Sequence, residues 1–138
     1  MIAMPAANEQ RNPYTGSPPR AWFLLRLAAE DGSTREFKLI ADTGNPFAII
    51  IDCKALVTFN DGEGPPVDTN FGPLDGAWFK IVMPEMGLTQ RVFGCASDEV
   101  VAAARRDHPD FEGLVGLPVL RLLEYGGNAA EFWIRAPR

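Results

Sequence analysis

The N-terminal half of the chain alternates between apolar runs and turn-forming residues, a pattern typical of β-structure. The apolar run 22–27 is followed by Asp31-Gly32, a dipeptide that favours a tight hairpin turn. Segment 35–41 then carries apolar side chains at alternate positions. The continuous apolar run 47–51 is typical of a strand that is buried on both faces. Together these segments predict a hairpin that leads into Asp42 and a buried strand that follows it.

The next part of the chain predicts a second hairpin, another strand and a helix. Segments 67–70 and 77–83 form the arms of the expected hairpin, with a glycine-bearing turn between them, and segment 91–95 forms the strand. A helix is expected at 98–106, because Ser97 can cap it, acidic residues fill its first turn and basic residues fill its last.

The end of the chain predicts a short buried strand, a second helix and a final strand. Segment 111–117 is the strand, and Pro118 suits the first turn of a helix that we expect to stop at Gly126. Segment 131–134 is the last strand. The expected fold class is therefore mainly β, with one or two short helices.

Composition indicates a single globular domain. The chain has 138 residues, of which 46% are hydrophobic and 22% are charged. Residues 1–20 are rich in Pro, Asn, Ser and Gly, so we expect a flexible arm or an extended strand before a domain at 21–138. No apolar stretch reaches the roughly 18 residues that a membrane helix needs, and 1–20 lacks the apolar core of a signal peptide. We therefore expect a cytoplasmic protein with no membrane partner.

The charge distribution argues against nucleic acid as a partner. The net charge is −5 at pH 7, and the densest basic spot is Arg105-Arg106. These two residues fall at the end of an expected helix, where cations are favoured by the helix dipole. Because phosphate binding requires a clustered basic surface, we do not expect nucleic-acid binding.

Cysteine and histidine are too few for a metal site. Cys53 and Cys95 lie far apart in the sequence and His108 is the only histidine, whereas a zinc site takes about four ligands. We expect two buried free thiols, no metal and no other cofactor. A Ser–His or Cys–His enzyme would depend on His108, and nothing near it suggests an activated nucleophile.

Asp42-Thr43-Gly44 is the motif with the clearest chemical content. It follows a hydrophobic strand, turns at a glycine and leads into another apolar strand, an arrangement that lifts a carboxylate out of a buried scaffold. Three-residue matches are common by chance, and turn chemistry alone also favours Asp in such a position. Other features of the sequence are needed to distinguish a catalytic Asp42 from an ordinary turn residue.

Three features in order make the chain resemble the retropepsin-like aspartic proteases. Segment 39–44 is similar to the family's hydrophobic strand and its catalytic Asp-Thr-Gly. The glycine-bearing hairpin at 71–76 stands where the family has its mobile flap. Segment 113–120 is similar to the family's hydrophobic-hydrophobic-Gly element, which runs into a C-terminal helix. The resemblance covers residues 21–134 or so and implies a closed acid-protease barrel.

The resemblance also implies a homodimer that hydrolyses peptide or protein substrates. Each subunit would supply one catalytic carboxylate, Asp42, because the chain holds only one Asp-Thr-Gly. Asp68-Thr69-Asn70 is not a second copy, since it lacks the glycine turn and the apolar strand that should follow. Two-fold pairing would bring Asp42 and its mate together around one water.

The family motifs imply roles for several other residues. Thr43 would hydrogen-bond across the two-fold axis, and Gly44 would permit the tight turn. Gly116 would lie beside the active-site loop, where a side chain would crowd it. The residues expected to bind substrate are those of the flap and of the later strand: Gly72, Pro73, Leu74, Asp75, Gly76, Val115 and Gly116. Leu74, Ile81 and Val115 are the expected walls of apolar pockets.

The chain departs from the family pattern, and the departure at Asn45-Pro46 keeps another function open. Asn45-Pro46 replaces the usual small residue after Asp-Thr-Gly; Asn45 can donate a hydrogen bond to the outer oxygen of Asp42, whereas Pro46 removes a backbone donor. The helix at 98–106 is longer than the family requires. The main alternative is a peptide-binding or dimerisation module with the same fold and little or no catalysis. A further alternative is an unrelated, monomeric β-barrel with Asp42 pointing to solvent.

Overall fold

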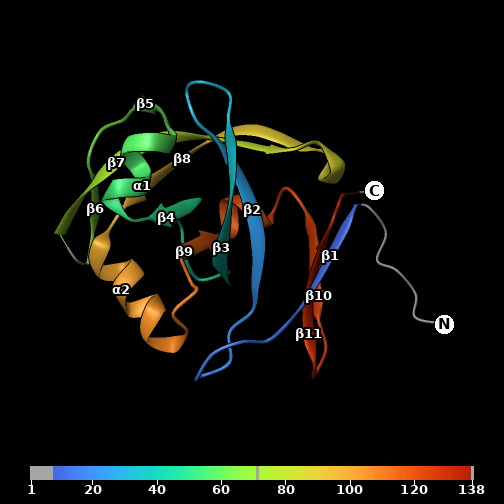
Figure 1. Cartoon of the computed structure of the whole chain (residues 1–138). Coiled ribbons are helices and arrows are strands. Elements are labelled where there is room, and N and C mark those ends of the chain that lie inside the picture. The colour runs from blue at the N-terminus through green and yellow to red at the C-terminus, as the bar shows by residue number, and fades with distance from the viewer. Residues whose placement is uncertain (1–7, 71, 138) are drawn as a thin grey trace.

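A computed structural model describes residues 8–70 and 72–137. Six strands form a closed barrel, because each pairs with the next and a contact between Leu27 and Ile81 joins the last strand back to the first (Figure 1). In spatial order these strands are β2 (Trp22–Ala28), β3 (Thr34–Asp42), β9 (Gly113–Gly116), β4 (Ile49–Ile51), β8 (Leu88–Ala96) and β7 (Gly72–Met83). Two short strands, β5 (Asn60–Glu63) and β6 (Val67–Thr69), pair with β7 outside the ring.

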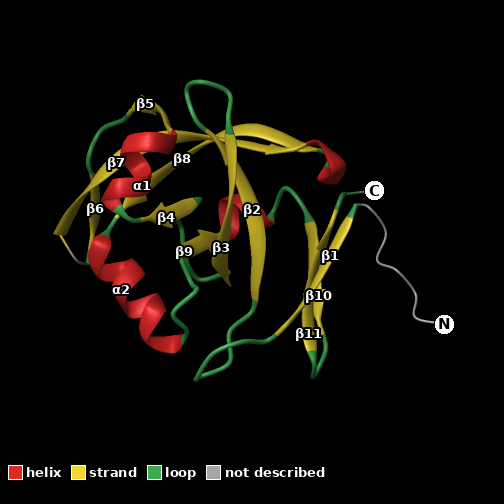
Figure 2. Cartoon of the chain, viewed as in Figure 1, coloured by secondary structure: helices red, strands yellow, loops and turns green. Residues whose placement is uncertain are grey.

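A separate three-stranded sheet lies at the end of the molecule opposite β5 and β6 (Figure 2). Its central strand is β11 (Glu131–Arg135), which pairs on one side with β1 (Glu9–Pro13) and on the other with β10 (Glu124–Gly127). The ring of Phe132 in this sheet stacks on that of Phe23 in the barrel, with centroids 6.5 Å apart. Residues 9–13 of the N-terminal segment are therefore held in a strand by the C-terminal part of the chain.

Alternating burial along the strands builds the barrel interior. In β2, Phe23, Leu25 and Leu27 are fully buried, and the residues between them are only partly so. The partner strand β3 adds Phe37 and Leu39 to the same core. Burying side chains of this size stabilises the fold by about 1.5–3 kcal/mol each. The expectation of a mainly β protein with a closed barrel and a few short helices is confirmed.

The helix α2 (Asp98–Asp107) was predicted from its end signals, and the structure confirms it. The Oγ of Ser97 accepts a hydrogen bond from the N–H of Val100 at 3.1 Å, which satisfies one of the free donors of the first turn. The inner side of α2 carries Val101 and Ala104, which are buried against the barrel.

The other short helices differ from the prediction. The helix α1 (Cys53–Phe59) was not expected; Asp52 caps it by accepting from the N–H of Ala55 at 2.7 Å. A single 3₁₀ turn, η1 (Pro84–Met86), connects β7 to β8. The helix α3 (Leu117–Leu120) starts beside Pro118 as expected, but its predicted extension to Gly126 is wrong. The chain at 124–127 pairs with β11 instead, so this tertiary pairing overrides local helix propensity.

The second hairpin turns earlier than predicted. Val67 pairs with Leu74 and Thr69 with Gly72, so the strands of the hairpin are already paired at Gly72 and the turn does not extend across 72–76. Residues 72–76 consequently belong to the strand β7. Phe71 lies outside the described residues.

The two cysteines lie in different environments. Cys95 is fully buried, as expected, whereas the prediction of a buried thiol at Cys53 is wrong because Cys53 begins α1 at the surface. Among residues 8–70 and 72–137, none of the helices combines the length and the apolar character needed to cross a bilayer.

Burial raises the pKa of the Cys95 thiol from 9.0 to about 11. The folded state therefore keeps this proton after the unfolded chain has lost it. We expect this contribution to the free energy of unfolding to be complete below pH 9 and to be lost as the pH rises towards about 11. When the free energy of unfolding is measured by denaturant across this pH range, it should decline less for Cys95→Ala than for the wild type. Equal declines in the two proteins would contradict the assignment.

Candidate active site

Asp42 lies at the point where the strand β3 leaves the barrel. It is the last residue of that strand, and its backbone is in parallel register with Gly116 at the end of β9. The N–H of Gly44 donates to Asp42 Oδ1 at 3.0 Å, and the N–H of Asn45 donates to the Asp42 carbonyl at 3.0 Å. The turn after the strand therefore fixes one carboxylate oxygen and leaves the other to a ligand or a partner.

Strand alternation places the Asp42 side chain outside the barrel core. Phe37 and Leu39 point inward, so Ile40 and Asp42 lie on the opposite face. Ile40 there joins Ala104 of α2 and Phe111 in a second apolar cluster. The carboxylate thus sits at the border of a surface that α2 covers.

Gly116 packs directly beneath the loop that follows Asp42. A Cβ at this position would lie 2.0 Å from the carbonyl oxygen of Phe47 and 2.5 Å from that of Asn45. The N–H of Gly116 donates to the carbonyl of Ala48 at 3.0 Å, and the next N–H, that of Leu117, donates to the carbonyl of Asn45 at 3.1 Å. Only glycine allows the two backbones to approach this closely.

The side chain of Asn45 points into the protein and does not make the hydrogen bond to Asp42 that the sequence suggested. Its side chain is 6% exposed, and its Oδ1 accepts from the N–H of Phe47 at 3.0 Å. Its Nδ2 has no hydrogen-bond partner within the described part of the chain, so it does not donate to Asp42. Pro46 beside it is exposed.

Two hollows meet at the Asp42 carboxylate. The first, of about 1030 Å³, runs between α2 and the segments 19–21 and 40–42. The second, of about 360 Å³, lies between the Asn45-Pro46-Phe47 loop and the β6–β7 hairpin. Asp42, Val100 and Leu114 line both, so the hollows adjoin at these residues, and the two together are called the groove.

The structure brings together some of the predicted site residues and separates others. Thr43 and Gly44 are exposed beside Asp42, and Leu74 lines the second hollow. Val115 and Ile81 are fully buried in the barrel core, and a Cβ on Gly76 would meet the carbonyl of Pro65 at 2.2 Å.

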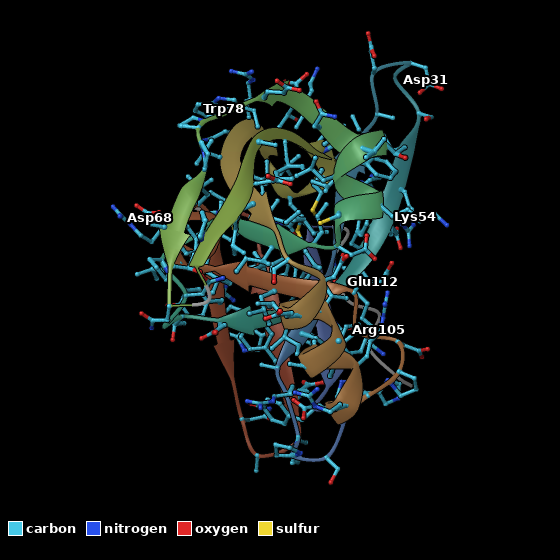
Figure 3. The ribbon with its side chains drawn as sticks, turned by 90° about the vertical axis from the view of Figure 1, so that its left-hand side faces the viewer. Asp31, Lys54, Asp68, Trp78, Arg105 and Glu112 are labelled. Atoms are coloured by element: carbon cyan, nitrogen blue, oxygen red, sulfur yellow. The ribbon has the colours of Figure 1, made fainter. Side chains whose placement is uncertain are left out.

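The far side of the hairpin carries the remaining predicted residues. Pro73 and Asp75 alternate with Leu74 along β7, so their side chains lie on the other face of that strand. Pro73 and Asp75 are exposed, and Gly72 adopts a left-handed φ of +89° at the start of the strand. In Figure 3, Asp68 lies at the outer edge of the molecule.

Most residues that line the groove were not predicted from the sequence, among them Leu114, Val100 and Ile50. Leu114 stands two positions before Gly116 and so shares its face of the strand, a signal that the sequence does contain. Val100 depends on where α2 packs, which no local pattern reveals. No three side chains among His, Cys, Asp and Glu come together as potential metal ligands in the described residues.

Comparison of the chain with models of protein families, with curated proteins and with solved structures finds no match. The resemblance to the retropepsin-like proteases therefore depends on the sequence motifs of this chain alone.

The close packing at Gly116 gives a stability prediction. Gly116→Ala should lower the free energy of unfolding by about 3 kcal/mol, because the new methyl group forces the β9 backbone away from the active-site loop. Gly32→Ala is the matched control; its φ is +84° but no atom lies within 4 Å of the added Cβ. Gly32→Ala should lower the free energy of unfolding by only about 1 kcal/mol, because alanine is strained in a left-handed conformation. Equal losses in chemical denaturation would show that the Gly116 contact is not tight.

Proposed function

We propose that the chain is one subunit of a homodimeric aspartic endopeptidase. The observation that carries the proposal is the position of Asp42, on a strand-end turn and at the junction of two hollows. An extended peptide that follows this groove would pass over the carboxylate with residues on both sides of it. This is the arrangement that endopeptidase cleavage requires.

A second subunit completes the chemistry, because each chain supplies one Asp-Thr-Gly turn. Isologous pairing around a two-fold axis brings Asp42 of each subunit to the same water. Two carboxylates that close together do not both ionise readily, so they share one proton over a wide range of pH. Their pH–rate profile should be bell-shaped, because activity is lost when both are protonated and when both are ionised.

Peptide hydrolysis then proceeds by general acid–base catalysis. The ionised Asp42 takes a proton from the water as its oxygen attacks the scissile carbonyl carbon. The protonated Asp42 of the other subunit hydrogen-bonds the carbonyl oxygen and supports the charge that develops there. Proton transfer to the leaving nitrogen releases the two peptide products, with no covalent intermediate.

The groove and the hairpin have properties suited to binding a peptide. Leu74 of the hairpin lines the second hollow together with Leu114 and Val100. A peptide lying between them would contact apolar walls on both sides. Closure of the hairpin over it would exclude water from the reacting groups.

The position of Asn45 favours a second candidate function. Because its side chain is buried and does not donate to Asp42, the turn provides only the Gly44 N–H to that carboxylate. A subunit whose dyad is poorly supported would still bind an extended peptide in the groove. The alternative is therefore a peptide-binding or dimerisation module with little or no catalysis.

Cleavage of a mixed peptide library from about pH 3 to pH 7 separates the two functions. We expect the wild type to cut between apolar residues, and Asp42→Asn to reduce the rate by at least about 100-fold, since it removes an essential acid–base group. Asp110→Asn is the matched control, because Asp110 is an exposed carboxylate outside the groove. Its cleavage should equal that of the wild type.

The dependence on protein concentration adds a second readout. In dilute solution the rate should rise with the square of the protein concentration, because the dimer is the active species. Cuts that persist in Asp42→Asn would rule out the proposed mechanism. A wild type that is dimeric and binds peptides, yet cuts none of them, would establish the binding module.

A further inference from the structure

One face of α2 forms the wall of the first hollow along the whole length of the helix. The residues on this face follow helical spacing: Glu99, Ala102, Ala103 and Arg106. Val100 stands beside them, where the two hollows meet. Val101 lies on the opposite side of the helix and is packed into the protein, and Ala104 is buried at the inner edge of the hollow.

Contacts at both ends hold α2 in place. At its start, the N–H of Ser97 donates to the carbonyl of Ile51 at 2.9 Å, and Asp98 Oδ1 accepts from the N–H of Cys53 at 2.9 Å. At its end, Asp107 pairs with Arg20 at 2.8 Å. The wall is therefore fixed relative to the carboxylate of Asp42, and positions along it correspond to positions along a bound peptide.

The charged residues of this region differ in whether they are paired. Arg20 is paired with Asp107, and Arg105 lies 3.7 Å from Asp52, away from the hollow. Figure 3 shows Arg105 on the side of α2 nearer Glu112 and Lys54. Arg106 lines the hollow and makes no ion pair with any residue that the structure describes.

Helix geometry gives the distance between this cation and the reaction centre. Val100 marks the part of α2 next to Asp42, and Arg106 lies six residues further along. A rise of about 1.5 Å per residue separates them by about 9 Å. An extended peptide advances about 3.3 Å per residue, so Arg106 stands opposite about the third residue from the scissile bond.

We propose that Arg106 selects substrates with an acidic side chain about three residues from the scissile bond. The inference rests on the proposed endopeptidase function and names its substrate class. Ala102 and Ala103 leave room along the wall for the peptide between the cut and the acidic residue. Because the dimer is symmetric, the same wall lies on both sides of the cut, and an acidic residue is favoured on either side.

The test compares peptides of one sequence that carry Glu, Gln or Lys at the third position from the cut, on each side in turn. The wild type should cleave the Glu peptide about 3-fold faster than the Gln peptide in kcat/KM at low salt, the effect of one exposed charge pair. The difference should appear in KM, because Arg106 is remote from the reacting atoms. It should fade as added salt screens the pair.

Two substitutions on adjacent arginines make the test specific. Arg106→Gln should reduce the Glu-to-Gln ratio to about 1, and Arg106→Glu should transfer the preference to the Lys peptide. Arg105→Gln is the matched control, because it removes an arginine from the same helix turn but not from the hollow. It should keep the wild-type ratio.

The outcomes separate this inference from the proposed function. Cleavage without any charge preference, or an equal loss of preference in Arg105→Gln and Arg106→Gln, overturns the role of Arg106 and leaves the protease in place. A wild type that cleaves no member of the set overturns both.

Discussion

The contact between Gly116 and the loop after Asp42 is the constraint on which the arrangement of the site depends. Two strands that are far apart in sequence, β3 and β9, run parallel and end together at Asp42 and Gly116. The absence of a side chain at Gly116 lets the carbonyls of Asn45 and Phe47 lie against its Cα. The loop is then held by the N–H groups at 116 and 117, and the Asp42 carboxylate is held by the loop. The buried strands β3 and β9 thus hold the Asp42 carboxylate in a fixed position at the surface.

The helix α2 converts this supported carboxylate into part of a groove. By covering Ile40 and Leu114 on the outer face of the barrel, it buries an apolar surface that would otherwise face water. Its remaining face forms one wall of the groove and contributes the charges of Glu99 and Arg106 to it. The three-stranded sheet has a different task, since it ties β1 to the C-terminal strands and packs on the barrel through Phe23 and Phe132.

Much of the fold follows from local sequence patterns. The strands β2 and β3 alternate regularly, and α2 carries a capping serine and charges matched to its dipole. The helix α1 escaped prediction because its seven residues are too short for an amphipathic period to be recognised. The length of α3 was overestimated because residues 124–127 give up helical structure to pair with β11, a partner that local propensity does not reveal.

The site was predictable in part. The prediction failed mainly for strands that are apolar on both faces, because their hydrophobic pattern does not show which face lines the site. Asp42 was predicted from its Asp-Thr-Gly motif in a strand-turn-strand setting, and Gly116 from the family resemblance. In β9 both Leu114 and Val115 are apolar, so hydrophobicity alone does not show which of them faces the core and which faces the groove. Only the spacing of Leu114 from Gly116, two positions, indicates the face on which Leu114 lies. The structure assigns Val115 to the core and Leu114 to the groove. The role of α2 as a wall depends on tertiary packing, which the amphipathic pattern alone does not place.

Mixing wild-type chains with Asp42→Asn chains tests most directly whether each subunit supplies half of one active site. The total protein concentration is kept constant and high enough for dimers to form, and the subunits are allowed to exchange before activity is measured. If both carboxylates are needed, only wild-type pairs are active, and an equal mixture should retain about one quarter of the wild-type activity. A linear decline, with about half of the activity left, would mean that each chain works alone and would contradict the account.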